Sequence, residues 1–180
     1  MLKTIAIFSS AGSAVFCLYF TAVYVIWGNP FLDNPKSVDF FIYLLAVAGG
    51  VSYYRYKVAG KEMGFLGGFG VGMGTTLCMV IVSILFVYLF TSSLVPNTLQ
   101  AHIKQRIGYF ETNKKAMVQH LNEQITKAKE NPEKITGEKI YNAQILVFQR
   151  LTAWDMAVYE AGKLLVGFII SLVTAALLRK

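Results

Sequence analysis

The stretch from Gly60 to Gly74, GKEMGFLGGFGVGMG, contains seven glycines in fifteen residues and decides how the fold is interpreted. Glycines recur every fourth residue in two sets, Gly60, Gly64, Gly68 and Gly72 in the first and Gly70 and Gly74 in the second. On a helix, residues four apart lie on nearly the same face. In lipid, glycines on one face let two helix backbones approach closely and gain van der Waals contact. The spacing therefore predicts a helix-packing seam at Gly64, Gly68 and Gly72, with Gly70 and Gly74 beside it.

Two other interpretations compete with this seam. In the first, residues 60–67 form an interfacial turn or a short amphipathic helix, and only the later glycines enter a membrane helix, because glycine weakens helices. In the second, GGFGVG is a phosphate-binding loop. Such a loop follows a strand and is followed by an acidic residue about 20 positions on, whereas this stretch lies between two apolar runs. The context therefore disfavours nucleotide binding.

The composition is that of a membrane protein. Of the 180 residues, 55% are hydrophobic and 15% are charged, compared with about 25% charged residues in soluble domains. Cys17 and Cys78 both lie in apolar runs, where a thiol is expected to be a small packing group. The net charge of +7 fits anionic lipid better than nucleic acid, since basic residues gather at predicted membrane ends.

Four apolar runs predict four transmembrane helices, at about residues 4–27, 38–54, 67–92 and 156–178. A helix needs roughly 20 residues to cross a hydrocarbon core about 30 Å thick. Six basic residues lie on one side of such an arrangement, namely Lys3, Arg55, Lys57, Lys61, Arg179 and Lys180. The positive-inside rule assigns that side to the cytoplasm. The sequence therefore predicts an all-α integral membrane protein, a single membrane domain over residues 1–180, with both termini cytoplasmic.

Residues 96–154, between the third and fourth spans, predict an extracytoplasmic helical hairpin. Its first arm spaces apolar residues mostly by three and four or by their sum, as on one helix face, and the predicted partner-binding face comprises Ile103, Ile107, Phe110, Met117 and Leu121. An amphipathic arm of this length needs a covering surface, which is either a partner protein or the second arm. Because no Gly or Pro interrupts residues 138–161, we expect the second arm to continue through Asp155 into the last span.

Glu160 and Lys163 are charged residues inside the last apolar run. Ionisable groups in a membrane are candidates for an ion or proton path. Both lie near the predicted outer boundary, however, and residues three apart can pair on one helix face while their ends extend to the headgroups. We therefore expect an outer-edge ion pair, and a similar outer position for Asp39.

His102 and His120 lie eighteen residues apart in the predicted outer helix, or about 27 Å along it. They cannot share a metal ion within one chain, and no Cys or further His lies at ligand spacing. Both are expected to be solvated surface residues. The sequence shows no pattern of nucleophile, base and acid, so we expect no enzyme activity, no cofactor and no metal site.

The layout resembles the small bacterial membrane proteins grouped as domain of unknown function 4199. The resemblance extends over essentially the whole chain and depends chiefly on YRYKVAGKEMGFLGGFGVG, from Tyr54 to Gly72, and on GFIISLVTAALLRK, from Gly167 to Lys180. It implies a bacterial inner-membrane protein with four spans. It implies no activity and assigns no site residue.

Two functions are expected from these features. The first is a non-enzymatic accessory or scaffolding subunit of a larger envelope complex, bound to the lipid bilayer and to other membrane protein subunits or to further copies of itself. The exposed hairpin favours it, since an amphipathic arm offers a docking surface. The second is a small oligomeric transporter or channel, for which a glycine-rich, irregular start of the third span could line a cavity.

Overall fold

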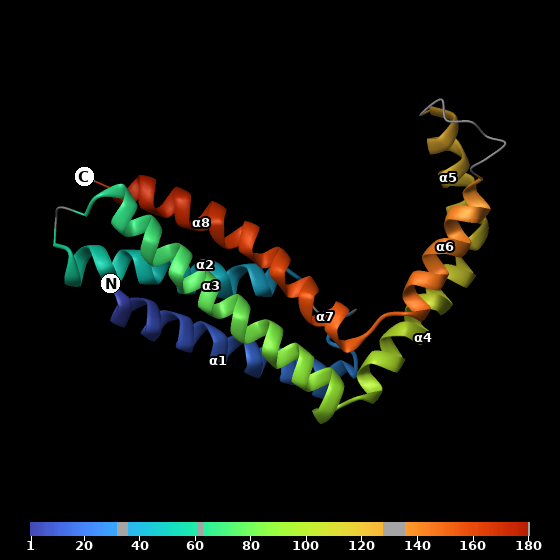
Figure 1. Ribbon diagram of the computed structural model, residues 1–180, viewed down its shortest axis with the longest axis horizontal. Coiled ribbons are helices and arrows are strands. Elements are labelled where there is room, and N and C mark those ends of the chain that lie inside the picture. Colours follow the sequence, from blue (N-terminus) through green and yellow to red (C-terminus); the bar gives the residue numbers. More distant parts are fainter. Residues whose placement is uncertain (32–35, 61–62, 128–135, 180) are drawn as a thin grey trace.

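A computed structural model of the chain describes residues 1–31, 36–60, 63–127 and 136–179, and all regular elements in these ranges are helical (Figure 1). One bundle contains the long helices α1 (Leu2–Trp27), α2 (Lys36–Tyr53), α3 (Phe65–Leu89) and α8 (Lys163–Leu178), with the short α7 (Ala153–Tyr159) ahead of α8. A separate arm contains α4 (Asn97–Thr112), α5 (Lys114–Lys127) and α6 (Gly137–Gln149). Short π-helical turns extend α2 and α3, at Tyr54–Val58 and Phe90–Leu94.

Within the described residues, three helical segments are long and apolar enough to cross a membrane: Leu2–Trp27, Phe65–Leu94 and Ala153–Leu178. These segments correspond to the first, third and fourth predicted spans. The second predicted span is α2, which is not among the three. It begins with Lys36 and Asp39, and charged residues near a helix end lower its mean hydropathy. The described residues thus provide three helical segments suited to crossing a membrane, as in a membrane protein, and a fourth, less apolar helix packed among them.

Glycines end helices at two turns of the bundle. Gly28 follows α1 at φ 77°, and its N–H donates to the Tyr24 carbonyl at 2.7 Å. Gly60 has φ 68° and lies in the turn before α3. Left-handed backbone is readily available to glycine alone. The glycine stretch is thus divided between a turn and a helix, because Gly64 caps α3 and the helix proper begins at Phe65.

The tightest helix contact joins α3 and α8, which run antiparallel (Figure 1). A methyl group added to Gly72 would lie 2.6 Å from Ser171 Oγ and 3.1 Å from Ser171 Cα. One added to Gly167 would overlap the Thr76 side chain. Each hydroxyl also donates to a carbonyl on its own helix, Thr76 to Gly72 at 3.0 Å and Ser171 to Gly167 at 2.6 Å. Each helix therefore offers one glycine gap and one small hydroxyl side chain that fills the gap of the other.

The other predicted seam glycines differ in what they face. Gly68 faces Met63 and Ala175, and Gly74 faces the side chain of Ile5 on α1. Gly70 has only the Met1 sulfur near it, at 3.8 Å, and a methyl group on Gly64 would meet nothing within 4 Å. The prediction that Gly64 belongs to the seam is not met within this chain, because the residue precedes the helix and has no neighbour within 4 Å in the described ranges.

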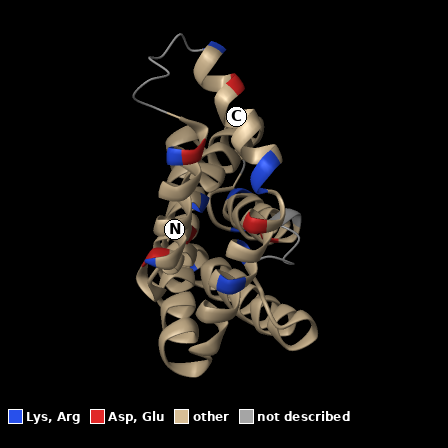
Figure 2. Cartoon of the chain, turned by 90° about the vertical axis from the view of Figure 1, so that its right-hand side faces the viewer, with Lys and Arg blue, Asp and Glu red and all other residues tan. Residues whose placement is uncertain are grey.

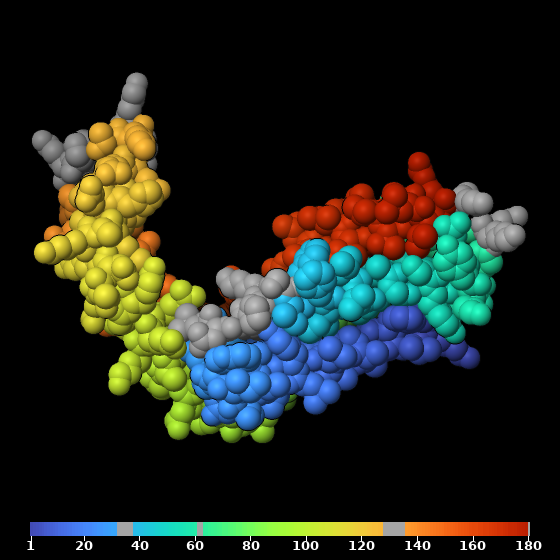
Figure 3. All heavy atoms as spheres, turned by 180° about the vertical axis from the view of Figure 1, so that it is seen from behind, coloured from blue at the N-terminus to red at the C-terminus, as the bar shows by residue number. Residues whose placement is uncertain are grey.

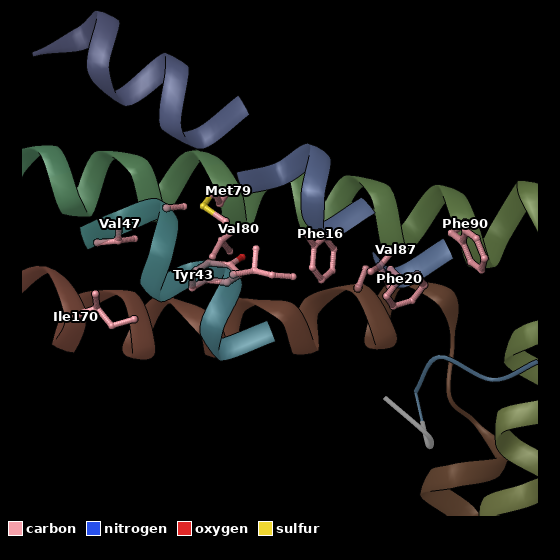
Figure 4. Packing of buried hydrophobic residues seen from close by; sticks show 12 residues of the cluster. Phe16, Phe20, Tyr43, Val47, Met79, Val80, Val87, Phe90 and Ile170 are labelled. Carbon is pink, nitrogen blue, oxygen red and sulfur yellow. The ribbon is translucent and has the colours of Figure 1, made fainter. Parts of the chain in front are cut away.

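Aromatic side chains pack the half of the bundle nearest the arm. Phe20 makes edge-on contacts with Phe86 and Phe90, with ring centroids 5.8 and 5.3 Å apart. Phe16 contacts Phe86 edge-on as well, and its ring is tilted against that of Phe20. Figure 4 shows Phe16, Phe20 and Phe90 at one end of this core, and Val47, Met79 and Ile170 toward the other. Small residues thus pack the end of the bundle away from the arm, while large rings pack the end near the arm.

The arm leaves the bundle at a marked angle, so that the molecule has the outline of an open V (Figures 1 and 3). Helix α6, the last helix of the arm, ends at Gln149, and α7 begins only at Ala153. Thr152 caps α7 through a capping box, in which its hydroxyl accepts from the Asp155 N–H and the Asp155 carboxylate accepts from the Thr152 N–H at 2.8 Å. The expectation of one helix running through Asp155 is wrong, since this box starts a new helix.

Within the arm, helix α6 packs against α4 and α5. Phe110 packs against Phe148 and Tyr141 of α6, with ring centroids 5.1 and 6.3 Å apart. The rest of the predicted partner-binding face, Ile103, Ile107, Met117 and Leu121, is half-buried. Lys114 on α5 pairs with Glu138 on α6, with 3.3 Å between Nζ and Oε1. Charged residues are prominent on the arm in Figure 2, whereas the bundle shows long uncharged stretches. The predicted partner-binding face is therefore partly covered by α6, while many other residues of the arm are exposed.

The seam predicts opposite effects for two glycines of α3. Gly72→Ala should destabilise the bundle by about 1–3 kcal/mol, the usual cost of overpacking, because its methyl group meets Ser171 backbone. Gly70→Ala has open space and should raise stability slightly, since alanine favours helix over glycine. Thermal unfolding in mild detergent measures both. Equal melting temperatures for the two variants would contradict the seam.

Candidate functional site

Three charged side chains from different parts of the chain meet inside the bundle. Asp39 belongs to the first turn of α2, Glu160 to a 3-10 turn at Glu160–Gly162, and Lys163 to the start of α8. Lys163 Nζ lies 2.9 Å from Asp39 Oδ2 and also pairs with Glu160. Glu160 is 7% exposed. The two residues expected to pair do so, and a third residue joins them.

The position of Lys163 differs from the sequence-based expectation. Its side chain does not extend outward to a membrane surface but turns into the bundle, where Nζ lies 4.3 Å from the Phe16 ring centroid and 5.7 Å from that of Tyr43. Ammonium groups are attracted to the faces of aromatic rings. The outward, headgroup-directed placement is therefore wrong, because two carboxylates and two rings hold the ammonium inside.

Local backbone geometry places these groups. Between α7 and α8, the helix tightens into the 3-10 turn at Glu160–Gly162, and tightened turns within helices often mark functional positions. On the facing helix, Tyr43 donates to or accepts from Ser83 on α3 at 3.3 Å, which fixes its ring beside the ammonium. The cluster is thus built where α2, α3 and the α7–α8 junction meet.

A cavity of about 620 Å³ adjoins the cluster. Its wall includes all three charged residues together with the aromatic residues Phe20, Phe31, Phe40, Tyr43 and Tyr159. Binding sites for small molecules typically measure about 300–1,000 Å³ and combine apolar walls with a few polar groups. This cavity has both properties. It lies at the arm end of the bundle, where the aromatic residues of the core gather.

A second polar contact region joins the arm to the bundle. Asn29, which follows α1 and is 4% exposed, donates to Gln105 Oε1 at 2.9 Å. Its own Oδ1 accepts from the Phe31 N–H at 3.1 Å. The Phe31 ring then contacts both Phe20 in the bundle and His102 in α4, with centroids 5.4 Å apart in each case. These residues, which we name the joint, hold the base of the arm on the bundle.

His102 is buried in the joint, with 5% of its surface exposed. Burial, and then the charge of Arg106, lowers the pKa of His102 to about 4. The expectation of a solvated His102 is wrong, because the segment after α1 folds over it. His120 does lie on the exposed surface, where it contacts Gln124. The two histidines therefore occupy different environments despite sharing one predicted helix face.

Protonation of His102 should weaken the joint. When the arm is undocked, the imidazole titrates near its ordinary pKa of about 6.5, whereas the docked imidazole stays neutral down to about pH 4. The undocked state therefore binds more protons between these values, and docking becomes less favourable as the pH falls through this window.

Hydrogen exchange of α4, corrected for intrinsic rates and compared at about pH 7 and about pH 4.5, measures this effect. We expect faster exchange at the lower pH in the natural protein and a smaller change in His102→Gln. His120→Gln is the matched control and should behave like the natural protein. An unchanged pH response in His102→Gln would contradict the assignment.

Comparison with known proteins places the whole of this architecture in one family. No curated protein and no solved structure matched the chain. The sequence pattern of the family described as "Protein of unknown function (DUF4199)" matches residues 6–180. That range contains the glycine seam, the charged cluster, the joint and the arm. The chain therefore belongs to the DUF4199 family of proteins.

Proposed function

We propose that the chain crosses the membrane four times, with α2 as the second span. Its helix and the following π-helical turn run without a break from Lys36 to Val58, long enough at 1.5 Å per residue to cross a core about 30 Å thick. One face of α2 is buried in the bundle, with Val47 and Val51 fully covered. The opposite face exposes Phe41 and Leu45, as a lipid-facing surface would.

The proposed orientation places the arm outside a bacterial inner membrane and both termini in the cytoplasm. Lys3, Arg55, Lys57 and Arg179 belong to helix ends on the side of the bundle away from the arm. Lys61 and Lys180, the other two basic residues of the prediction, lie outside the described residues. Positive charge at one set of helix ends favours the cytoplasmic side for that end.

The function that the geometry supports best is a non-enzymatic accessory or scaffolding subunit of an envelope complex. The observation that carries this proposal is the joint, in which Asn29, Phe31 and His102 fix the arm by buried contacts. A connection that is both polar and buried is specific in geometry, since unsatisfied groups would be costly in any other arrangement. The bundle would thus anchor the protein in lipid and present the arm to other subunits at a set angle.

The alternative proposal is a small oligomeric transporter or channel. The buried cluster of Asp39, Glu160 and Lys163 favours it, because ionisable groups inside a membrane commonly mark a transport path. Against it, the half of the bundle beyond the cluster is closed by the contact of Gly72 with Ser171 and of Gly167 with Thr76. A path across the membrane would have to open this seam or run between copies of the chain.

A photo-crosslinking amino acid at Val147 tests the accessory role in the native membrane. Val147 lies on α6 and is 63% exposed, so its side chain is available to a partner that binds the arm. The same crosslinker at Ile169, which is 55% exposed on the bundle, is the matched control. We expect a crosslink to a different polypeptide at Val147 and none at Ile169, with native mass spectrometry giving the mass of the intact assembly.

Crosslinks at Val147 only to further copies of this chain, in a closed homo-oligomer, would contradict the accessory role. That result would favour the transporter or channel, which flux measurements in liposomes would then test. A crosslink to a different polypeptide at Ile169 but not at Val147 would assign docking to the bundle and remove the proposed role of the arm.

A further inference from the structure

The charged cluster carries more acid than base. Asp39 and Glu160 contribute two carboxylates, and Lys163 is the one cation paired with them among the residues that the structure describes. With all three groups ionised, the cluster has a formal charge of −1. Charge inside a low-dielectric region is costly unless a partner balances it. The composition of the cluster therefore favours a second positive group.

One carboxylate oxygen of the cluster lacks a partner. Asp39 Oδ2 binds Lys163, but Asp39 Oδ1 is buried and has no hydrogen-bond partner in the described part of the chain. Buried polar atoms are nearly always hydrogen-bonded, and an exception calls for a missing donor. Asp39 belongs to the wall of the cavity, so a donor bound there would be close to this residue.

The cavity wall is suited to an ammonium group. Aromatic faces attract cations, and amines in proteins are commonly held between rings and carboxylates. The structure already holds one ammonium in this way, that of Lys163 between Phe16, Tyr43 and the two carboxylates. Phe31, Phe40 and Tyr159 supply further aromatic surface around the open volume.

We propose that the cavity binds a primary ammonium group, carried by a ligand whose apolar part lies against the aromatic wall. The ammonium supplies the missing donor to Asp39 and brings the cluster to neutrality. The cavity lies at the arm end of the bundle (Figure 1), and two sources can supply an ammonium there, a lipid headgroup or a free amine. This site is independent of the accessory role and goes beyond it.

Two probes separate these sources. Phosphatidylethanolamine supplies a lipid ammonium and n-hexylamine a free one, and N-acetylphosphatidylethanolamine and n-hexanol are the counterparts that lack the ammonium. The purified full chain in mild detergent is mixed with each probe, and native mass spectrometry gives the affinity. We expect at least one ammonium probe to bind about tenfold more tightly than its counterpart without the ammonium, the range of a charge-assisted hydrogen bond.

Variants that change the charge of the cluster test the mechanism. Asp39→Asn removes the negative charge and one of the two acceptor oxygens, and should weaken binding of the ammonium probe about tenfold. Glu160→Gln makes the same charge change and replaces it if Asp39→Asn does not fold. Glu138→Gln, on the exposed arm, should leave the affinity unchanged. The double variant Asp39→Asn/Lys163→Met has the original charge of −1 and should bind more tightly than Asp39→Asn alone.

The outcomes are distinct. Tighter binding of phosphatidylethanolamine alone assigns the site to a lipid headgroup, and tighter binding of hexylamine alone assigns it to a free amine. The proposal would be overturned if, in both pairs, the probe with the ammonium and the probe without it bound equally tightly. It would also be overturned if the double variant bound no better than Asp39→Asn, because the cluster would then act only through its structure. Neither result would affect the crosslinking test of the arm.

Discussion

The exchange of small residues between α3 and α8 is the contact on which the rest of the bundle depends. Gly72 receives Ser171, and Gly167 receives Thr76, in an antiparallel arrangement. In lipid there is little hydrophobic gain from bringing two apolar helices together, so contact area has to come from close backbone approach. The hydroxyl groups that fill the gaps bond to carbonyls of their own helices, and therefore enter the contact without an unsatisfied polar atom.

The two ends of the bundle are packed by different kinds of residue. Glycine and small hydroxyl residues pack α3 against α8 away from the arm, whereas the rings of Phe16, Phe20 and Phe90 pack the end nearest the arm. The cavity lies at the end packed by rings, and the Lys163 side chain turns inward beside it. Lys163 has a long flexible stem, which lets its ammonium reach Asp39 on the facing helix.

The sequence predicted the helices better than the breaks and contacts between them. Hydropathy located the three helical segments that are long and apolar enough to cross a membrane, because 18 or more apolar residues leave few alternatives to a membrane helix. Four-residue spacing placed Gly68 and Gly72 on a contact face. The break before α7 escaped detection, since neither Gly nor Pro marks it. Its signal was Thr152 followed three residues later by Asp155, ahead of an apolar run, which is the pattern of a capping box.

Burial of His102 and the inward turn of Lys163 could not be read from local pattern, because both depend on segments distant in sequence. Asp39 and Lys163 were each placed at the outer end of a span, so their equal depth was available as a signal for pairing. Burial of His102 had no comparable signal, since it requires the residues after α1 to cross the base of α4.

Phe31 connects the two features that the structure adds to the sequence. Its ring belongs to the wall of the cavity and also contacts His102 in the joint, while its backbone is fixed by Asn29. A side chain held on two sides in a close-packed region cannot shift for one neighbour without disturbing the other. The cavity and the base of the arm therefore share a wall. Whatever shape the cavity adopts has to be compatible with a docked arm, because the same ring completes both.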